Sequence, residues 1–89
     1  MDVLLHPIPN KYLGRLNEPD KSYIKKALKR LEMEPPEGDI IPFSGQPGYY
    51  RLKIGSYRAI FRYGDNCILV THLDPRGQAY NKKNKEGKR

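Results

Sequence analysis

The 89-residue chain has one cysteine, no tryptophan and no long run of apolar residues. A single Cys67 cannot form a disulfide within the chain or supply a cysteine-rich zinc site, which favours a reducing compartment. We therefore expect a cytoplasmic protein. No stretch approaches the roughly 18 consecutive apolar residues of a membrane helix. The first residues also lack a basic region followed by an apolar run, so neither membrane insertion nor export is expected.

Motifs for nucleotide and metal chemistry are also missing. The sequence contains no glycine-rich phosphate loop, no dinucleotide-binding fingerprint, no HExxH motif and no acidic cluster with the spacing of metal ligands. We expect no metal and no small-molecule cofactor. Any chemistry on phosphate would then depend on cationic side chains.

Acidic residues are scarce in one part of the chain only. The protein has 17 Lys and Arg against 10 Asp and Glu, a formal charge of +7. Residues 1–39 carry seven of each sign, whereas residues 40–79 carry five cations against two acids and residues 80–89 five against one. This asymmetry favours a polyanionic or acidic partner that meets the C-terminal half.

The N-terminal half predicts a short strand over Val3–Leu5, ended by Pro7, and then two helices. In each helix the apolar residues recur at helical spacing. They are Ile8, Tyr12, Leu13 and Leu16 in the first, and Ile24, Ala27, Leu28 and Leu31 in the second. Asn17 is a suitable N-cap for the second helix, and Pro35 and Pro36 end it near Met33.

The C-terminal half predicts three strands, over residues 49–54, 57–63 and 67–73, separated by turn-forming Gly55-Ser56 and Gly64-Asp65-Asn66. The expected fold is α+β: a short N-terminal strand, a two-helix hairpin and a three-stranded antiparallel meander, with the helices on one face of the sheet. At this length we expect one domain, over residues 1–80. Residues 81–89 are predicted to form a flexible basic tail.

The Gly55-Ser56 turn fixes the pairing of the first two meander strands. Three pairs then share an apolar face: Ile54 with Tyr57, Leu52 with Ala59, and Tyr50 with Phe61. The other face takes Lys53 with Arg58, Arg51 with Ile60, and Tyr49 with Arg62. These two strands place four cations and no acid on that face, which predicts an anionic ligand because like charges that face each other are destabilising. The alternative is that long cationic stems merely shield the back of the sheet, with their heads in water.

The position of His72 depends on the second turn. A three-residue loop of Gly64, Asp65 and Asn66 would place His72 opposite Arg58 on the charged face, whereas a two-residue loop would place it opposite Ala59, toward the core. The sequence leaves both open, and with them the choice between a catalytic and a structural histidine.

Three segments together resemble the RelE branch of the RelE/ParE toxin superfamily. They are Tyr50-Arg51-Leu52-Lys53, Gly55-Ser56-Tyr57-Arg58 and Pro75-Arg76-Gly77-Gln78-Ala79-Tyr80. The resemblance spans nearly the whole chain. It implies a RelE-like fold and the toxin of a toxin-antitoxin pair, an mRNA endonuclease that acts on the ribosome. It also implies metal-independent cleavage, by attack of a ribose 2′-hydroxyl on the adjacent phosphate.

The resemblance assigns roles by position. Arg51 would be an electrostatic clamp and Arg58 a phosphate ligand. Lys53 would be the general base, because neighbouring cations disfavour its charged form while arginine stays protonated. Tyr80 would stack on or position the scissile nucleotide. We expect further RNA contacts from Arg62, Tyr49, Lys82 and Lys83.

The general acid has two candidates, Arg76 and His72, because Asp74 and Pro75 stand where some family members carry their catalytic Arg or His. Other functions remain alternatives: a ParE-like inhibitor of DNA gyrase, or a catalytically inactive module that binds RNA or an antitoxin. Expected partners are an antitoxin, the ribosome and mRNA. The antitoxin would use an amphipathic helix and acidic residues placed over the charged face.

Overall fold

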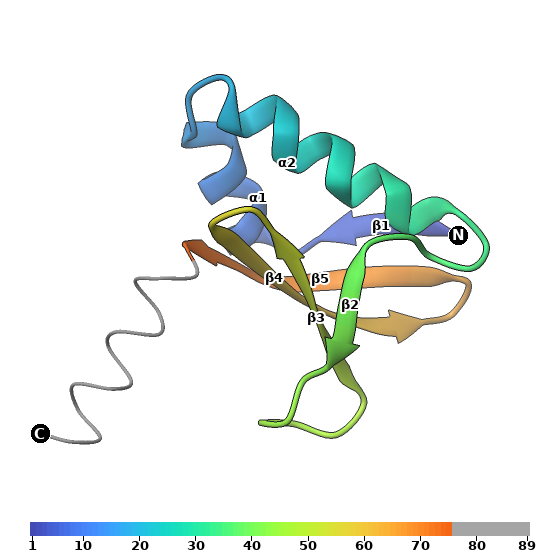
Figure 1. Ribbon diagram of the computed structural model, residues 1–89. Coiled ribbons are helices and arrows are strands. Elements are labelled where there is room, and N and C mark those ends of the chain that lie inside the picture. Colours follow the sequence, from blue (N-terminus) through green and yellow to red (C-terminus); the bar gives the residue numbers. More distant parts are fainter. Residues whose placement is uncertain (76–89) are drawn as a thin grey trace, which may run out of the picture.

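The computed structural model describes residues 1–75, which form the expected α+β fold (Figure 1). The predicted 81–89 tail and the site candidates Arg76, Tyr80, Lys82 and Lys83 lie outside the described residues. The elements are β1 (Asp2–Leu5), α1 (Pro7–Arg15), α2 (Asp20–Lys29), the 3-10 turn η1 (Arg30–Glu32), β2 (Asp39–Pro42), β3 (Tyr49–Ile54), β4 (Tyr57–Gly64) and β5 (Cys67–Pro75). No helix of this part of the chain is long and apolar enough to cross a membrane.

The strands form one mixed sheet in the order β1-β5-β4-β3-β2. The predicted meander is its centre, and β1 pairs in parallel with β5 at one edge. The sheet has one strand more than predicted, because β2 pairs antiparallel with β3 at the other edge. This strand is short and ends at Pro42, which has no N–H to donate, as is typical of sheet edges.

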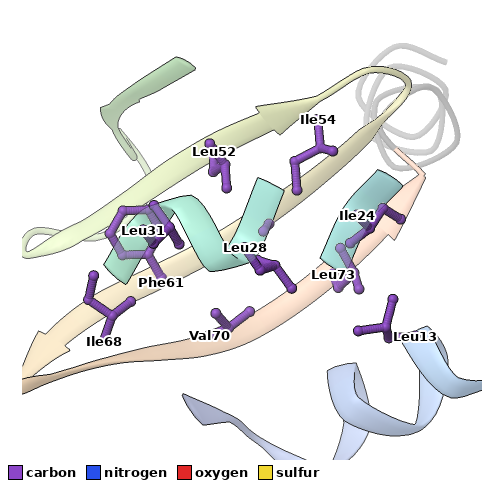
Figure 2. Close-up of a cluster of buried hydrophobic side chains, with 11 residues drawn as sticks. Leu13, Ile24, Leu28, Leu31, Leu52, Ile54, Phe61, Ile68, Val70 and Leu73 are labelled. Atoms are coloured by element: carbon purple, nitrogen blue, oxygen red, sulfur yellow. The ribbon is translucent and has the colours of Figure 1, made fainter. Parts of the chain in front are cut away.

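Both helices lie on the same face of the sheet (Figure 1), and the core fills the space between the two layers. Figure 2 shows the apolar side chains of the helical layer lying among those of the strands. The buried residues of this core are Leu13, Ile24, Leu28 and Leu31 from the helical layer, and Leu52, Ile54, Ala59, Phe61, Ile68, Val70 and Leu73 from the sheet. Within residues 1–75, no helix covers the opposite face of the sheet.

The helices differ from expectation in two details. Ile8, which helical spacing groups with Tyr12 and Leu13, is 81% exposed. Pro9 and Leu13 form the buried stripe of α1, and Ile8 lies roughly 140° from Leu13 around the helix axis. Asn17 is not the N-cap of α2. Pro19 holds that position, and the Glu18 carboxylate accepts a hydrogen bond of 3.1 Å from the Ser22 backbone N–H. Hydrogen bonds from Ser22 lower the pKa of Glu18.

Candidate functional site

The pairing of β3 with β4 confirms the predicted register. Ile54 faces Tyr57, Lys53 faces Arg58, and the remaining pairs follow to Tyr49 and Arg62. The turn depends on Gly55, whose φ of +61° is unfavourable for residues with a side chain. A Cβ at that position would also lie 3.2 Å from the ring of Tyr23.

We call the uncovered side of the sheet the open face and define it by the register of β2 to β5. It consists of Asp39, Ile41, Tyr49, Arg51, Lys53, Arg58, Ile60, Arg62, Gly64, Cys67, Leu69, His72 and Asp74. Six of the predicted site residues therefore share one face. They are Tyr49, Arg51, Lys53, Arg58, Arg62 and His72.

The open face carries acids as well as cations, whereas the sequence of β3 and β4 predicted cations alone. On β2 Asp39 faces Lys53, and on β5 Asp74 faces Arg58. Neither acid lies within 4.0 Å of a cation of this face. The ion pairs among residues 1–75 are instead Arg30 with Glu37 and the N-terminal amine with Glu34, both at 3.5 Å. Lys53 and Arg58 therefore each face an acid without forming an ion pair with it, whereas Arg51 and Arg62 face no acid.

Two guanidinium groups of the open face are partly desolvated. The Nε atoms of Arg51 and Arg58 are buried and have no hydrogen-bond partner within residues 1–75. A buried donor left unpaired costs about 1–3 kcal/mol, and more for a charged group. The terminal nitrogens of the two guanidinium groups can donate charge-assisted hydrogen bonds to an anionic oxygen.

Ile60 lies among the half-buried arginines of the open face. It is only 4% exposed although it belongs to the open face. Its neighbours by register are Arg51 and His72 across the strands, and Arg58 and Arg62 lie two residues away on β4. Arginine stems commonly cover apolar surface in this way, and Ile60 thereby limits the freedom of the guanidinium heads.

His72 lies on the open face, as one of the two sequence alternatives predicted, but its strand partner is one that neither alternative gave. The turn at Asp65 and Asn66 has two residues, since Gly64 faces Cys67, which by itself would place His72 opposite Ala59. However, the register shifts between Ile60 and Phe61, where Thr71 is inserted as a β-bulge. His72 therefore faces Ile60 on the open face and is exposed.

The remaining site residues differ in exposure. Lys53 is exposed, with Arg58 opposite on one side and Asp39 on the other, so its surroundings are of mixed charge. Tyr49 and Arg62 are half-buried and face each other at the far end of the hairpin. Sequence reasoning missed Asp39, Asp74 and Thr71 as neighbours, since only the strand order and the bulge bring them to this face.

A cavity of about 600 Å³ lies elsewhere, between α2 and the edge of the sheet formed by β2 and β3. Its apolar lining comes mainly from Tyr23, Ala27, Met33, Leu52 and Ile54, and only Asp39 and Lys53 connect it with the open face. Within residues 1–75 no three His, Cys, Asp or Glu side chains are grouped so that they could hold a metal ion. The cationic side chains of the open face can bind an anion and take part in proton transfer.

Two kinds of comparison with known proteins gave matches. A family model described as the ParE toxin of the type II toxin-antitoxin system parDE matches residues 9–80. The chain is 30% identical to a chain of the crystal structure of the archaeal RelE-RelB complex from Pyrococcus horikoshii OT3, with a TM-score of 0.68, covering 86% of this chain and 96% of that one. It also shares the fold of a chain in the RelB-RelE antitoxin-toxin complex from Methanococcus jannaschii, at 20% identity and a TM-score of 0.69, covering 89% and 96%. A comparison with curated proteins gave no match.

Proposed function

The chain belongs to the ParE toxin family and is a RelE-type toxin of the RelE/ParE superfamily, and from this premise we propose that it is a ribosome-dependent mRNA endonuclease. Cleavage proceeds without a metal ion, by attack of a ribose 2′-oxygen on the adjacent phosphorus. The 2′-oxygen forms a bond to phosphorus, the bond from phosphorus to the 5′-oxygen breaks, and a 2′,3′-cyclic phosphate and a 5′-hydroxyl result. The open face is the site of this reaction.

The observation that carries the proposal is the pair of buried, unpaired Nε atoms of Arg51 and Arg58. The two residues lie on adjacent strands, two pairing positions apart in register, and are diagonal neighbours on one face, so both guanidinium groups can contact one phosphate. During attack, negative charge accumulates on the non-bridging oxygens of that phosphate. Donors already in place and already desolvated stabilise this charge without reorganisation.

Proton transfer requires two further groups. Lys53 is exposed near the Gly55-Ser56 end of β3, where its amine can reach the 2′-hydroxyl of bound RNA and accept its proton. His72, on the same face, supplies the proton to the departing 5′-oxygen, and Arg76 is the second candidate for that role. Tyr80 would position the scissile nucleotide, as the resemblance implies. Tyr49 and Arg62 extend the RNA contact along the hairpin.

A primer-extension assay on mRNA in a translating extract tests the proposal. We expect the wild-type toxin to cut at defined codon positions, and Arg58→Ala and Lys53→Ala to lower the cleavage rate about 100-fold or more. Lys11→Ala is the matched control, because it removes one exposed charge from α1, away from the open face. Growth arrest by a toxin that leaves mRNA intact on stalled ribosomes would contradict the proposal.

The match to the ParE toxin model supports a second candidate, a ParE-like toxin, for which the resemblance implies inhibition of DNA gyrase. A supercoiling assay separates the two, since a gyrase inhibitor would block supercoiling and leave mRNA whole. An inactive RNA-binding module would instead bind RNA with steep salt dependence and cut nothing. Only the endonuclease requires both the arginine pair and the lysine of the open face.

We further propose a cognate antitoxin as partner, supported by the two similar structures, both of which are toxin-antitoxin complexes. Acidic side chains of the antitoxin would engage the same unpaired guanidinium groups that bind RNA phosphate. Antitoxin and RNA would then compete, and added antitoxin should suppress cleavage in the same assay.

A further inference from the structure

The β-bulge at Thr71 determines which side of the sheet His72 occupies. On β5 both Val70 and Leu73 are buried against the helices, although they are three residues apart and a regular strand would place them on opposite faces. The extra residue restores the inward position of Leu73 and moves His72 outward. Bulges occur often where a side chain must be re-aimed near an active site.

Thr71 also forms hydrogen bonds at this point. Its Oγ1 lies 3.3 Å from the carbonyl oxygen of Ile60 and 2.9 Å from Nδ1 of His72. A hydroxyl has one proton to donate, and a carbonyl oxygen can only accept. Both contacts are satisfied at once only when Thr71 donates to Ile60 and accepts from an N–H at Nδ1 of His72.

We propose that Thr71 is a positioning residue that holds His72 with its Nδ1 protonated and its Nε2 turned to the RNA. This inference rests on the proposed endonuclease function for its catalytic meaning, but its structural part does not. The hydrogen bond made by one imidazole nitrogen decides which proton the other carries. His72 faces Ile60, and Ile60 faces Arg51, so the imidazole lies about two strand spacings, roughly 10 Å, from Arg51 along one row of the sheet.

The reaction step then balances without a change of tautomer. The imidazolium of His72 donates its Nε2 proton to the 5′-oxygen, which keeps the electron pair of the breaking bond to phosphorus. The neutral imidazole that remains still has its proton on Nδ1, bonded to Thr71. The same hydrogen bond therefore serves His72 before and after the transfer.

Nitrogen chemical shifts of the imidazole rings test the structural part in the full-length protein, uniformly labelled with nitrogen-15 and at a pH where both histidines are neutral. The chain has only two histidines, and His6 is an internal reference because it makes no side-chain cap hydrogen bond at the start of α1. We expect His72 to show the Nδ1–H form and His6 the Nε2–H form that free imidazole prefers. In Thr71→Val the His72 shifts should move to those of the Nε2–H form, whereas Thr71→Ser should keep the wild-type form. A wild-type His72 in the Nε2–H form, or no change in Thr71→Val, overturns the proposal.

Cleavage kinetics test the catalytic part. We expect kcat to fall about 100-fold in His72→Gln and about 10-fold in Thr71→Val, with KM unchanged because the arginine pair is intact, and to recover in Thr71→Ser. His6→Gln should cleave like the wild type. Normal kcat in Thr71→Val together with a changed tautomer would show that Thr71 positions His72 without serving catalysis, which overturns the catalytic part. A wild-type protein that cuts no mRNA overturns the proposed function, and the tautomer result still decides the role of Thr71.

Discussion

The helix-covered face and the open face are made by the same strands, yet they differ in what determines the position of each side chain. On the helix-covered face, Leu52, Ala59 and Phe61 are buried because each is apolar and points inward, and their neighbours are interchangeable apolar groups. On the open face, Arg58 depends on its particular neighbours: Lys53 on one side, Asp74 on the other and the buried Ile60 beside it.

This difference separates stability from function within one sheet. Burial of apolar area stabilises the fold in proportion to the area removed from water, with little regard to identity. The open face instead keeps two Nε donors that are buried and unpaired within residues 1–75, which lowers stability, and in the proposed function this face binds the phosphate. Substitutions on the helix-covered face should therefore mainly lower stability, whereas substitutions on the open face should mainly change binding and activity.

The largest expected effect on stability comes from the helix-covered face. Phe61 is fully buried, and Phe61→Ala should reduce the free energy of unfolding by about 3–5 kcal/mol, because it removes the ring and leaves a cavity. The adjacent Arg62, on the open face, should cost less than about 0.5 kcal/mol when replaced by Ala. Urea denaturation of both variants measures the contrast. A loss of comparable size in Arg62→Ala would show that the open face also holds the fold together.

Local patterns were sufficient to predict one of these faces. The apolar alternation and the Gly55-Ser56 turn predicted β3, β4 and their register, and Ile24, Leu28 and Leu31 were placed in the core from spacing alone. Ile8 was misplaced because the short α1 buries only the narrow stripe of Pro9 and Leu13. Helical spacing in the sequence gave four candidates for that stripe, which are Ile8, Tyr12, Leu13 and Leu16.

The open face could be predicted only in part, because its composition depends on contacts distant in sequence. The cations of β3 and β4 followed from one hairpin, but Asp39 belongs to an edge strand too short to be recognised. The positions of Asp74 and His72 follow from the β-bulge in β5, which the local sequence of that strand does not predict. The bulge is a compromise between two demands: Val70 and Leu73 are both buried, and β5 must still pair with β4.

A smaller effect is expected on RNA affinity when an acid of the open face is neutralised. It shows whether these acids weaken the binding of anions. Asp74 faces Arg58, and Asp74→Asn should tighten RNA binding about 2- to 5-fold at low salt, the scale of one exposed charge pair. The gain should shrink as salt rises, because exposed charges are screened. Fluorescence anisotropy with a short RNA at two salt concentrations measures it. Asp65→Asn makes the same charge change in the turn between β4 and β5. An equal gain there would mean that only net charge matters.

The smallest effect concerns the hydrogen bond that joins the two layers. The hydroxyl of Tyr57 on β4 donates to Oδ2 of Asp20 at the start of α2, at 2.6 Å. This bond, with desolvation and the charge of Asp20, raises the pKa of Tyr57 to about 12. In the unfolded chain tyrosine loses its proton near pH 10. The folded state therefore keeps a proton that the unfolded state has already lost, so the stabilisation is complete below about pH 10 and disappears as the pH rises toward 12.

Tyr57→Phe isolates this contribution. The difference in unfolding free energy between the wild type and the variant should be constant from pH 7 to about 10 and then decline. Tyr63→Phe is the control, because Tyr63 is 41% exposed and its hydroxyl has no hydrogen bond within residues 1–75. The difference in unfolding free energy between the wild type and Tyr63→Phe should stay constant over the same pH range. If the Tyr57 difference also stays flat, the link between sheet and helix comes from ring packing rather than from the hydroxyl. The two layers would then be joined, as the core is, by apolar contact alone.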